Sequence, residues 1–265
     1  MTINTDGTCF GDLWRDAVAT RSNAPFLVFE TSSGSSHAWT YAEFDDVVAR
    51  AAAKLTGLGV TQGDSVNLAL TNSPAFVALW LASIRLGAWI VPSDPQSRTQ
   101  ELIEHQSRTQ TRVGVCSVHR KDEFLAAAQS IPVIVIDEDD CELAVFGTEK
   151  FIDWPRLNIR DRAAVMFTSG TTGRPKRVDI SQANYAFAGQ VMATASGLTP
   201  DDRQLVVLPL FHANAQYYSF ASAIAVGASV ALMSTFSATR FLQQAKTYAA
   251  THASLFAAPI RMILA

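Results

Sequence analysis

Short apolar runs recur along the first half of the sequence, and stretches with helical patterning separate them. Each run is short enough for a buried strand, and each separating stretch is about a dozen residues long, as expected of a crossover helix. Strands that alternate with helices in this way pair in parallel. The alternation therefore predicts an α/β fold with mostly parallel sheets covered by helices on both faces. The predicted strands in this part are residues 26–29, 65–70, 88–91, 112–116 and 132–136.

The stretches between these runs carry helix start and stop signals. Glu43 follows Thr40 by three residues, which is the signature of a capping box. Gly57 and Gly59 are suited to end the helix that Thr40 starts. The predicted helices are therefore residues 10–22, Thr40 to about Gly57, 75–86, a helix starting near Ser97, and 121–129.

A long segment without charged residues extends from Gln204 to Thr239, so a membrane-spanning helix has to be considered. Its best candidate, 217–233, is shorter than a usual span of about 20 residues, contains Gly227 and lacks basic flanks. We therefore expect no membrane span and interpret the segment as a core helix followed by a core strand. The predicted elements in this half are strands at 163–167, 205–208 and 228–232, an extended piece at 178–180, and a helix from the N-cap Ser181 to about Ser196.

The strand at 163–167 leads into a loop of hydroxyls and glycines, Thr168-Ser169-Gly170-Thr171-Thr172-Gly173-Arg174-Pro175-Lys176. Glycines let the backbone approach a ligand, hydroxyls and N–H groups bind phosphate oxygens, and a lysine adds a mobile charge. The spacing does not match a Walker-type loop, because Lys176 stands three residues beyond the second glycine. Pro175 disfavours a helical Arg174, so we expect no helix directly after the loop. The loop predicts a site that closes over a triphosphate.

Four motifs resemble those of the adenylate-forming superfamily, which includes acyl-CoA synthetases, peptide-synthetase adenylation domains and luciferases. The loop together with Phe167 resembles the family's phosphate-loop signature. In the family's order, the other three are Trp39-Thr40-Tyr41-Ala42-Glu43-Phe44, Leu86-Gly87-Ala88-Trp89-Ile90-Val91-Pro92 and Leu208-Pro209-Leu210-Phe211-His212. The resemblance implies that residues 1–265 are a partial N-terminal, large domain, without the family's small C-terminal domain. The apolar end at 258–265 fits the expectation of a longer enzyme.

The resemblance also implies a reaction in two steps. A carboxylic acid reacts with ATP and Mg²⁺ to give an acyl-adenylate and pyrophosphate, and coenzyme A then accepts the acyl group. The implied catalytic residues are Lys176 and His212. Thr172 is a candidate contact of Mg²⁺, and no other residue here is assigned to the metal. The implied phosphate-binding residues are Thr168, Ser169, Gly170, Thr171, Thr172, Gly173 and Lys176.

Polar side chains also stand at the start of the uncharged segment, at His212, Asn214 and Gln216. The residues alone fit two interpretations equally. They orient a ligand at the mouth of an apolar pocket, or they cap a helix and satisfy buried backbone groups. The resemblance implies that His212 borders the carboxylate substrate, so we expect the acyl pocket at these three residues.

Two residues depart from the family pattern. Arg177 stands where the family usually has glycine, and Gln182 stands where histidine is frequent. Arg177 either stiffens the loop or adds its charge to phosphate binding, and both interpretations stay open. The remaining histidines, His37, His105, His119 and His252, have no recognisable partners and are expected at the surface.

Composition limits the classes of partner. The net charge is −3, so no general basic field indicates a nucleic acid or an anionic membrane. The three cysteines form neither a metal pattern nor a disulfide framework, and the first residues lack the features of a signal peptide. We therefore expect a cytoplasmic protein. The resemblance, and not the composition, implies that its partners are a small carboxylic acid, ATP and either coenzyme A or an amine.

Two alternatives to this function remain. In the first, the adenylate passes to an amine, and the enzyme forms an amide. In the second, a half-length chain is a non-catalytic protein that binds a nucleotide or an acid. The second follows from two residues of the family that have no counterpart here, the catalytic lysine of the small C-terminal domain and the magnesium-binding glutamate. For the same reason, we expect this fragment alone to be inactive.

Overall fold

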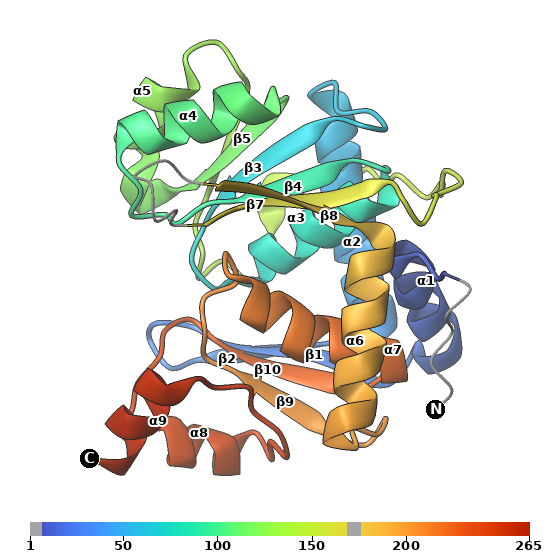
Figure 1. Ribbon diagram of the computed structural model, residues 1–265, viewed down its shortest axis with the longest axis vertical. Helices are drawn as coiled ribbons and strands as arrows, with labels where there is room; N and C mark the ends of the chain where they lie inside the picture. Colours follow the sequence, from blue (N-terminus) through green and yellow to red (C-terminus); the bar gives the residue numbers. More distant parts are fainter. Residues whose placement is uncertain (1–6, 169–175) are drawn as a thin grey trace.

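The computed structural model describes residues 7–168 and 176–265, which form two β-sheets with helices between and outside them (Figure 1). Parallel pairs dominate, and the antiparallel pairs in this part of the chain are β1 with β2 and β7 with β8. The four-stranded sheet has the order β2 (Ser36–Thr40), β1 (Pro25–Glu30), β10 (Ser229–Met233) and β9 (Arg203–Val206). The six-stranded sheet has the order β6 (Val133–Ile136), β5 (Val113–Ser117), β3 (Ser65–Ala69), β4 (Trp89–Pro92), β7 (Arg162–Thr168) and β8 (Lys176–Ser181).

Helices fill the space between the sheets and cover their outer faces, which confirms the predicted fold class (Figure 1). Those between the sheets are α1 (Phe10–Arg21), α2 (Tyr41–Gly57), α3 (Pro74–Arg85), α6 (Gln182–Ser196) and α7 (Ser222–Val226). The outer helices are α4 (Thr99–Thr109) and α5 (Lys121–Ala128) on the six-stranded sheet, and α8 (Phe241–Thr247) and α9 (Ala257–Leu264) beside the other. None of the described helices is both long and apolar enough to cross a membrane.

Helix α3 lies at the centre of a core that the two sheets share. Its twelve residues are all buried, and it starts with Pro74 after the N-cap Ser73, whose hydroxyl accepts the N–H of Phe76. Trp80 of α3 stacks on Phe10 of α1 with ring centroids 5.3 Å apart. The same hydrophobic cluster contains residues of both sheets, and smaller clusters lie on the six-stranded and on the four-stranded sheet.

Several helix ends match the expected signals. Thr40 and Glu43 form the predicted capping box at the start of α2: the Thr40 N–H donates to the Glu43 carboxylate, and the Glu43 N–H donates to the Thr40 hydroxyl. Ser181 caps α6 through the N–H of Asn184, and Gly197 ends that helix with a φ of 67°. These local signals fix the boundaries of the two helices.

The uncharged segment differs from its prediction in the type of helix. Residues Ala215–Ala221 form a π-helix, labelled η3, which continues as α7 and ends at Gly227. It packs against α6 at Gly189, where a Cβ atom would lie 2.5 Å from the carbonyl oxygen of Ala221. β9 also begins earlier than predicted, and β2 and α8 were not predicted. Short 3₁₀ turns occur at η1 (Val118–Arg120) and η2 (Ala144–Phe146).

Candidate functional site

The two ends of the predicted phosphate loop lie opposite each other. Thr168 ends β7, Lys176 begins β8, and the two residues are partners in the antiparallel pair. Both are exposed, and Lys176 makes no ion pair with any residue in the described part of the chain. A strand follows the loop, so the prediction that no helix starts directly after it is confirmed. The other phosphate-binding candidates, Ser169, Gly170, Thr171, Thr172 and Gly173, lie outside the described residues.

A buried histidine supports the strand that leads into this loop. The ring of His105 lies flat on Phe167, with centroids 4.1 Å apart and an interplanar angle of 6°. Its Nδ1 is 2.9 Å from the Ser93 hydroxyl, which in turn accepts a hydrogen bond from Asn67. Burial lowers the pKa of His105. The expectation that His105 lies at the surface was therefore wrong, because the sequence does not reveal that Phe167 and Ser93 enclose it.

The two departures from the family pattern make contacts inside the protein. The Arg177 guanidinium donates to Asp179 at 2.9 Å and to the Arg108 carbonyl, in the last turn of α4, at 3.2 Å. Side chains alternate along a strand, so Arg177 and Lys176 project from opposite faces of β8. This geometry favours stiffening of the hairpin over phosphate binding by Arg177. Gln182 is buried and accepts the Gly11 N–H at 3.1 Å, which links α6 to α1.

The acyl-pocket candidates lie at the start of η3, but their surroundings differ. Gln216 is fully buried, and its amide donates to the Leu210 carbonyl and accepts the Tyr185 hydroxyl. Both ends of this amide are thus used within the protein. The Oδ1 atom of Asn214 is buried and has no hydrogen-bond partner among the described residues. Asn214 is therefore the better placed of the two amides to meet a ligand.

His212 stands at the end of the segment that follows β9. Its N–H donates to the Pro209 carbonyl at 3.1 Å, and its side chain is largely exposed. Surrounding protein atoms still lower the pKa of His212 by desolvation, and the Asp94 carboxylate acts in the opposite direction. The lowered pKa favours the neutral imidazole, which can both donate and accept a hydrogen bond. Among described residues, no hydrogen bond connects the His212 side chain with the hairpin of β7 and β8.

An apolar cavity of about 350 Å³ opens where strands of both sheets end. Its lining includes residues that follow three strands: Asn72 after β3, Leu208 and Phe211 after β9, and Phe236 after β10. Pro259 of α9 also lines the cavity. Ligands of open parallel sheets usually bind outside the carboxyl ends of strands, and apolar walls suit the hydrocarbon part of an acid. The cavity adjoins the segment that carries His212, so it is the candidate acyl site.

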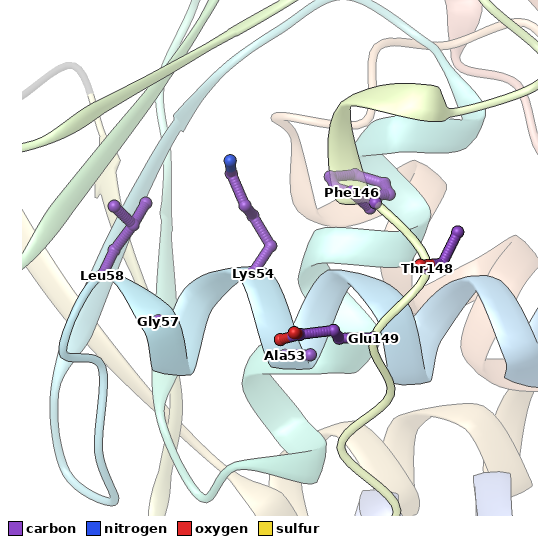
Figure 2. Close-up of a pocket in the computed structure, with 8 residues that line it drawn as sticks. Ala53, Lys54, Gly57, Leu58, Phe146, Thr148 and Glu149 are labelled. Carbon is purple, nitrogen blue, oxygen red and sulfur yellow. The ribbon is translucent and has the colours of Figure 1, made fainter.

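A second hollow, of about 270 Å³, lies between the end of α2 and the segment after η2. Figure 2 shows Lys54 of α2 rising between Leu58 and Phe146, while Glu149 lies across the helix. None of the four motifs contributes a residue to this hollow. It is therefore not part of the candidate site, and Lys54 offers a lysine away from the hairpin for comparison.

The described residues provide no cluster of metal ligands. Within residues 7–168 and 176–265, no three His, Cys, Asp or Glu side chains gather in a way that could hold an ion. Thr172, the candidate magnesium contact, lies outside this part of the chain. We therefore assign no magnesium ligand.

Comparison with known proteins decides the family. The model of one family, described as AMP-binding enzyme, matches residues 14–265. The chain belongs to the AMP-binding enzyme family. Its membership agrees with the four motifs, and the resemblance to adenylate-forming enzymes is confirmed.

Relatives in this family cover the chain almost completely. Crotonobetaine/carnitine–CoA ligase of Salmonella enteritidis PT4 is 29% identical over 266 residues, which covers 95% of this chain and 52% of that protein. The fold matches a long-chain-fatty-acid-CoA ligase (FadD1) of Archaeoglobus fulgidus with a TM-score of 0.86 at 21% identity, covering 97% of this chain and 53% of that one. It matches the N-terminal domain of FACL13 of Mycobacterium tuberculosis with a TM-score of 0.80 at 25% identity, covering 96% and 64%. This AMP-binding chain spans about half the length of the curated relatives it matches.

The sequence of this AMP-binding chain did not predict that two polar residues near the motifs, Asn72 and His105, are buried and hydrogen-bonded. Asn72 falls in the stretch Thr71-Asn72-Ser73-Pro74, which has the composition of an ordinary turn. His105 falls in the polar helix α4. No local signal separates a buried amide or imidazole from an exposed one, because the enclosing residues come from distant parts of the chain.

Proposed function

We propose that the protein to which these residues belong activates a carboxylic acid with ATP, releases pyrophosphate and transfers the acyl group to coenzyme A. The observation that carries this proposal is the exposed Lys176, which lies opposite Thr168 and forms no ion pair with the described residues, in a chain of the AMP-binding enzyme family. Transfer to coenzyme A is supported by the named activity of the crotonobetaine/carnitine–CoA ligase relative.

In the first step, a carboxylate oxygen of the acid attacks the α-phosphorus of ATP. A new P–O bond forms, the bond between the α-phosphorus and the bridging oxygen breaks, and pyrophosphate leaves. Acid and triphosphate repel each other, so the protein must position them and offset negative charge. We assign that role to the Lys176 ammonium, which would hold the departing pyrophosphate, and to the Thr168 hydroxyl. Ser169, Gly170, Thr171, Thr172 and Gly173 are the further phosphate contacts that we propose.

The acid would lie in the cavity beside His212. The imidazole of His212 and the Oδ1 of Asn214, which has no hydrogen-bond partner among the described residues, are proposed to border its polar end. Gln216 would act indirectly, through the Leu210 carbonyl and the Tyr185 hydroxyl. In the second step, the thiol of coenzyme A attacks the acyl carbon, and AMP leaves. We assign no residue of this chain to coenzyme A.

Replacement of the hairpin lysine tests the proposal. In the full-length protein, Lys176→Ala should slow acid-dependent exchange of pyrophosphate into ATP by about a hundredfold or more, because one stabilising group for the developing charge is lost. Lys54→Ala is the matched control, since it removes the same charge at the hollow of Figure 2. The control should retain the wild-type rate.

Equal exchange rates in Lys176→Ala and Lys54→Ala would contradict the assigned role of Lys176. Absence of acid-dependent exchange in the wild-type protein, over a panel of aliphatic and aromatic acids, would refute the proposed function itself. If the wild-type protein does show exchange, added coenzyme A should yield an acyl-CoA thioester. Thioester formation would distinguish a thiol acceptor from an amine.

A further inference from the structure

Asn72 lies where the carboxyl ends of the two sheets meet. It follows β3 of the six-stranded sheet, and only 3% of its surface is exposed. A buried amide loses its hydrogen bonds to water, so its partners within the protein have to replace them. The partners of Asn72 therefore show what its side chain holds in place.

The amide of Asn72 makes three hydrogen bonds with main-chain groups. Its Nδ2 donates to the Leu208 carbonyl at 3.1 Å and to the Met233 carbonyl at 3.0 Å. Its Oδ1 accepts the N–H of Leu210 at 2.8 Å. Two acceptors and one donor thus surround a side chain with two N–H donors and one oxygen acceptor. Aspartate would offer no donor to the two carbonyls, and serine would offer only one.

These bonds join strand ends of both sheets. Met233 ends β10, Leu208 and Leu210 follow β9, and Asn72 follows β3. The neighbouring residue Thr71 is itself fixed, because its N–H and its hydroxyl donate to Glu138 at 2.6 Å and 2.9 Å. Asn72 therefore holds the four-stranded sheet from an anchored position on the six-stranded one.

The main-chain N–H and the main-chain carbonyl of Leu210 are both hydrogen-bonded to side chains. Its N–H donates to Asn72, and its carbonyl accepts a hydrogen bond from Gln216 in η3. His212 follows Leu210 closely, and Asn72 and Leu208 both line the cavity of about 350 Å³. His212 is not a lining residue, but Phe211, which precedes it, is. The position of His212 next to the cavity consequently depends on the segment that Asn72 holds.

We propose that Asn72 is a positioning residue for recognition of the acid. Its amide holds the main chain of residues 208–210 so that His212 stands beside the cavity. Asn72 acts through Leu210 and does not touch the reacting atoms. The kinetic part of its test rests on the proposed function, whereas the structural part does not.

Asn72→Asp is the most informative variant. The substitution keeps the shape and one acceptor, but it places a carboxylate against the carbonyls of Leu208 and Met233. Asn67→Asp is the matched control. Asn67 is fully buried in β3, and its Nδ2 donates to the Val91 carbonyl at 2.8 Å and to the Ser93 hydroxyl at 2.9 Å. Both variants lose two donated hydrogen bonds, but only Asn72 contacts residues 208–210.

The measurements are amide hydrogen exchange and acid-dependent pyrophosphate exchange on the full-length protein. Asn72→Asp should speed hydrogen exchange of a peptide covering residues 208–212 by about tenfold or more, because the Leu208–Leu210 segment loses its hold. It should raise the KM for the acid about tenfold and leave the KM for ATP within about twofold. Asn67→Asp should leave the protection of this peptide unchanged, so it controls for the loss of two donated hydrogen bonds from a buried amide.

The outcomes separate the two levels of proposal. Unchanged hydrogen exchange at residues 208–212 in Asn72→Asp would overturn the positioning role, as would an equal rise of the KM values for acid and ATP. If the wild-type protein shows no acid-dependent exchange, the proposed function fails, and hydrogen exchange still decides whether Asn72 holds the segment. If Asn72→Asp does not fold, Asn72→Ser replaces it, with a smaller effect expected in the same direction.

Discussion

At the residue scale, the pair of His105 and Phe167 brings a titratable ring close to the phosphate hairpin. Phe167 precedes Thr168, and His105 packs flat on its ring while contacting the Ser93 hydroxyl. His105 is 8% exposed, so protonation of its imidazole would place a charge where little water can solvate it. The packing of β7 is thereby coupled to the protonation of His105.

This coupling predicts a pH dependence of stability. Burial lowers the pKa of His105 below the ordinary value of about 6.5, so the unfolded chain binds more protons as the pH falls below about 6.5. The free energy of unfolding should therefore decrease from about pH 6.5 downward and level off below the folded-state pKa. His105→Asn should show a shallower decrease when urea midpoints are measured between pH 5 and 7.5 (about the range in which histidine titrates).

His212→Asn provides a comparison for this experiment. The pKa of His212 is lowered as well, so its replacement should also reduce part of the slope. Identical pH profiles for His105→Asn and wild type would contradict the prediction.

Arg177 belongs to the same scale: its guanidinium joins Asp179 and the end of α4, a contact that a glycine at this position cannot make.

At the scale of elements, the close contact between α6 and η3 controls the helix that carries Asn214 and Gln216. Gly189 faces the carbonyl of Ala221 so closely that any side chain must displace main chain. π-Helical turns are uncommon and often occur at functional sites. The position of η3 therefore depends on the absence of a side chain at residue 189.

Gly189→Ala should lower the free energy of unfolding by about 1–3 kcal/mol, although alanine favours helix by about 1 kcal/mol over glycine. The reason is the distance of 2.5 Å that a Cβ atom would have to the Ala221 oxygen. Gly57→Ala is the control, because Gly57 ends α2 and a Cβ atom there meets no atom within 4 Å. Urea midpoints of the two variants should move in opposite directions or differ clearly, and equal midpoints would disprove the steric argument.

The sequence predicts helices and strands well where the spacing of apolar residues agrees with the capping and terminating residues. The boundaries of α2 and α6 follow from Thr40, Ser181 and Gly197, whose side chains or φ values act locally. β2 was missed because Ser36–Thr40 is a short edge strand with mostly exposed residues and no apolar alternation. The π-helical form of η3 has no local signal, since it appears where α6 approaches at Gly189. The same limit explains why His212 and the loop could be named in advance and Asn72 could not.

At the scale of the whole molecule, the two sheets share their largest hydrophobic cluster. Helix α3 is buried on all sides, and the cluster around it contains side chains from both sheets. Loss of one sheet would expose the helices that the other sheet needs. The described parts of the chain should therefore behave as one cooperative unit.

Unfolding should accordingly occur in a single transition. Far-ultraviolet circular dichroism, which follows helices, and tryptophan fluorescence, which follows buried residues such as Trp14 and Trp80, should give the same urea midpoint. Hydrogen exchange would provide an independent check on strands of both sheets. Two separate midpoints, or early exchange confined to β1, β9 and β10, would show that the sheets unfold independently.

The pairing of β1 with β10 also has a consequence for the growing chain. Leu27 is in register with Val230, so β1 pairs with a strand that is about 200 residues away. At roughly 5–20 residues per second, the ribosome needs on the order of 10–40 s to synthesise the chain between them. During this time β1 can bind only β2, and its other edge is open to strands of other nascent chains. Successful synthesis of this protein therefore depends on what shields Pro25–Glu30 until β10 leaves the ribosome.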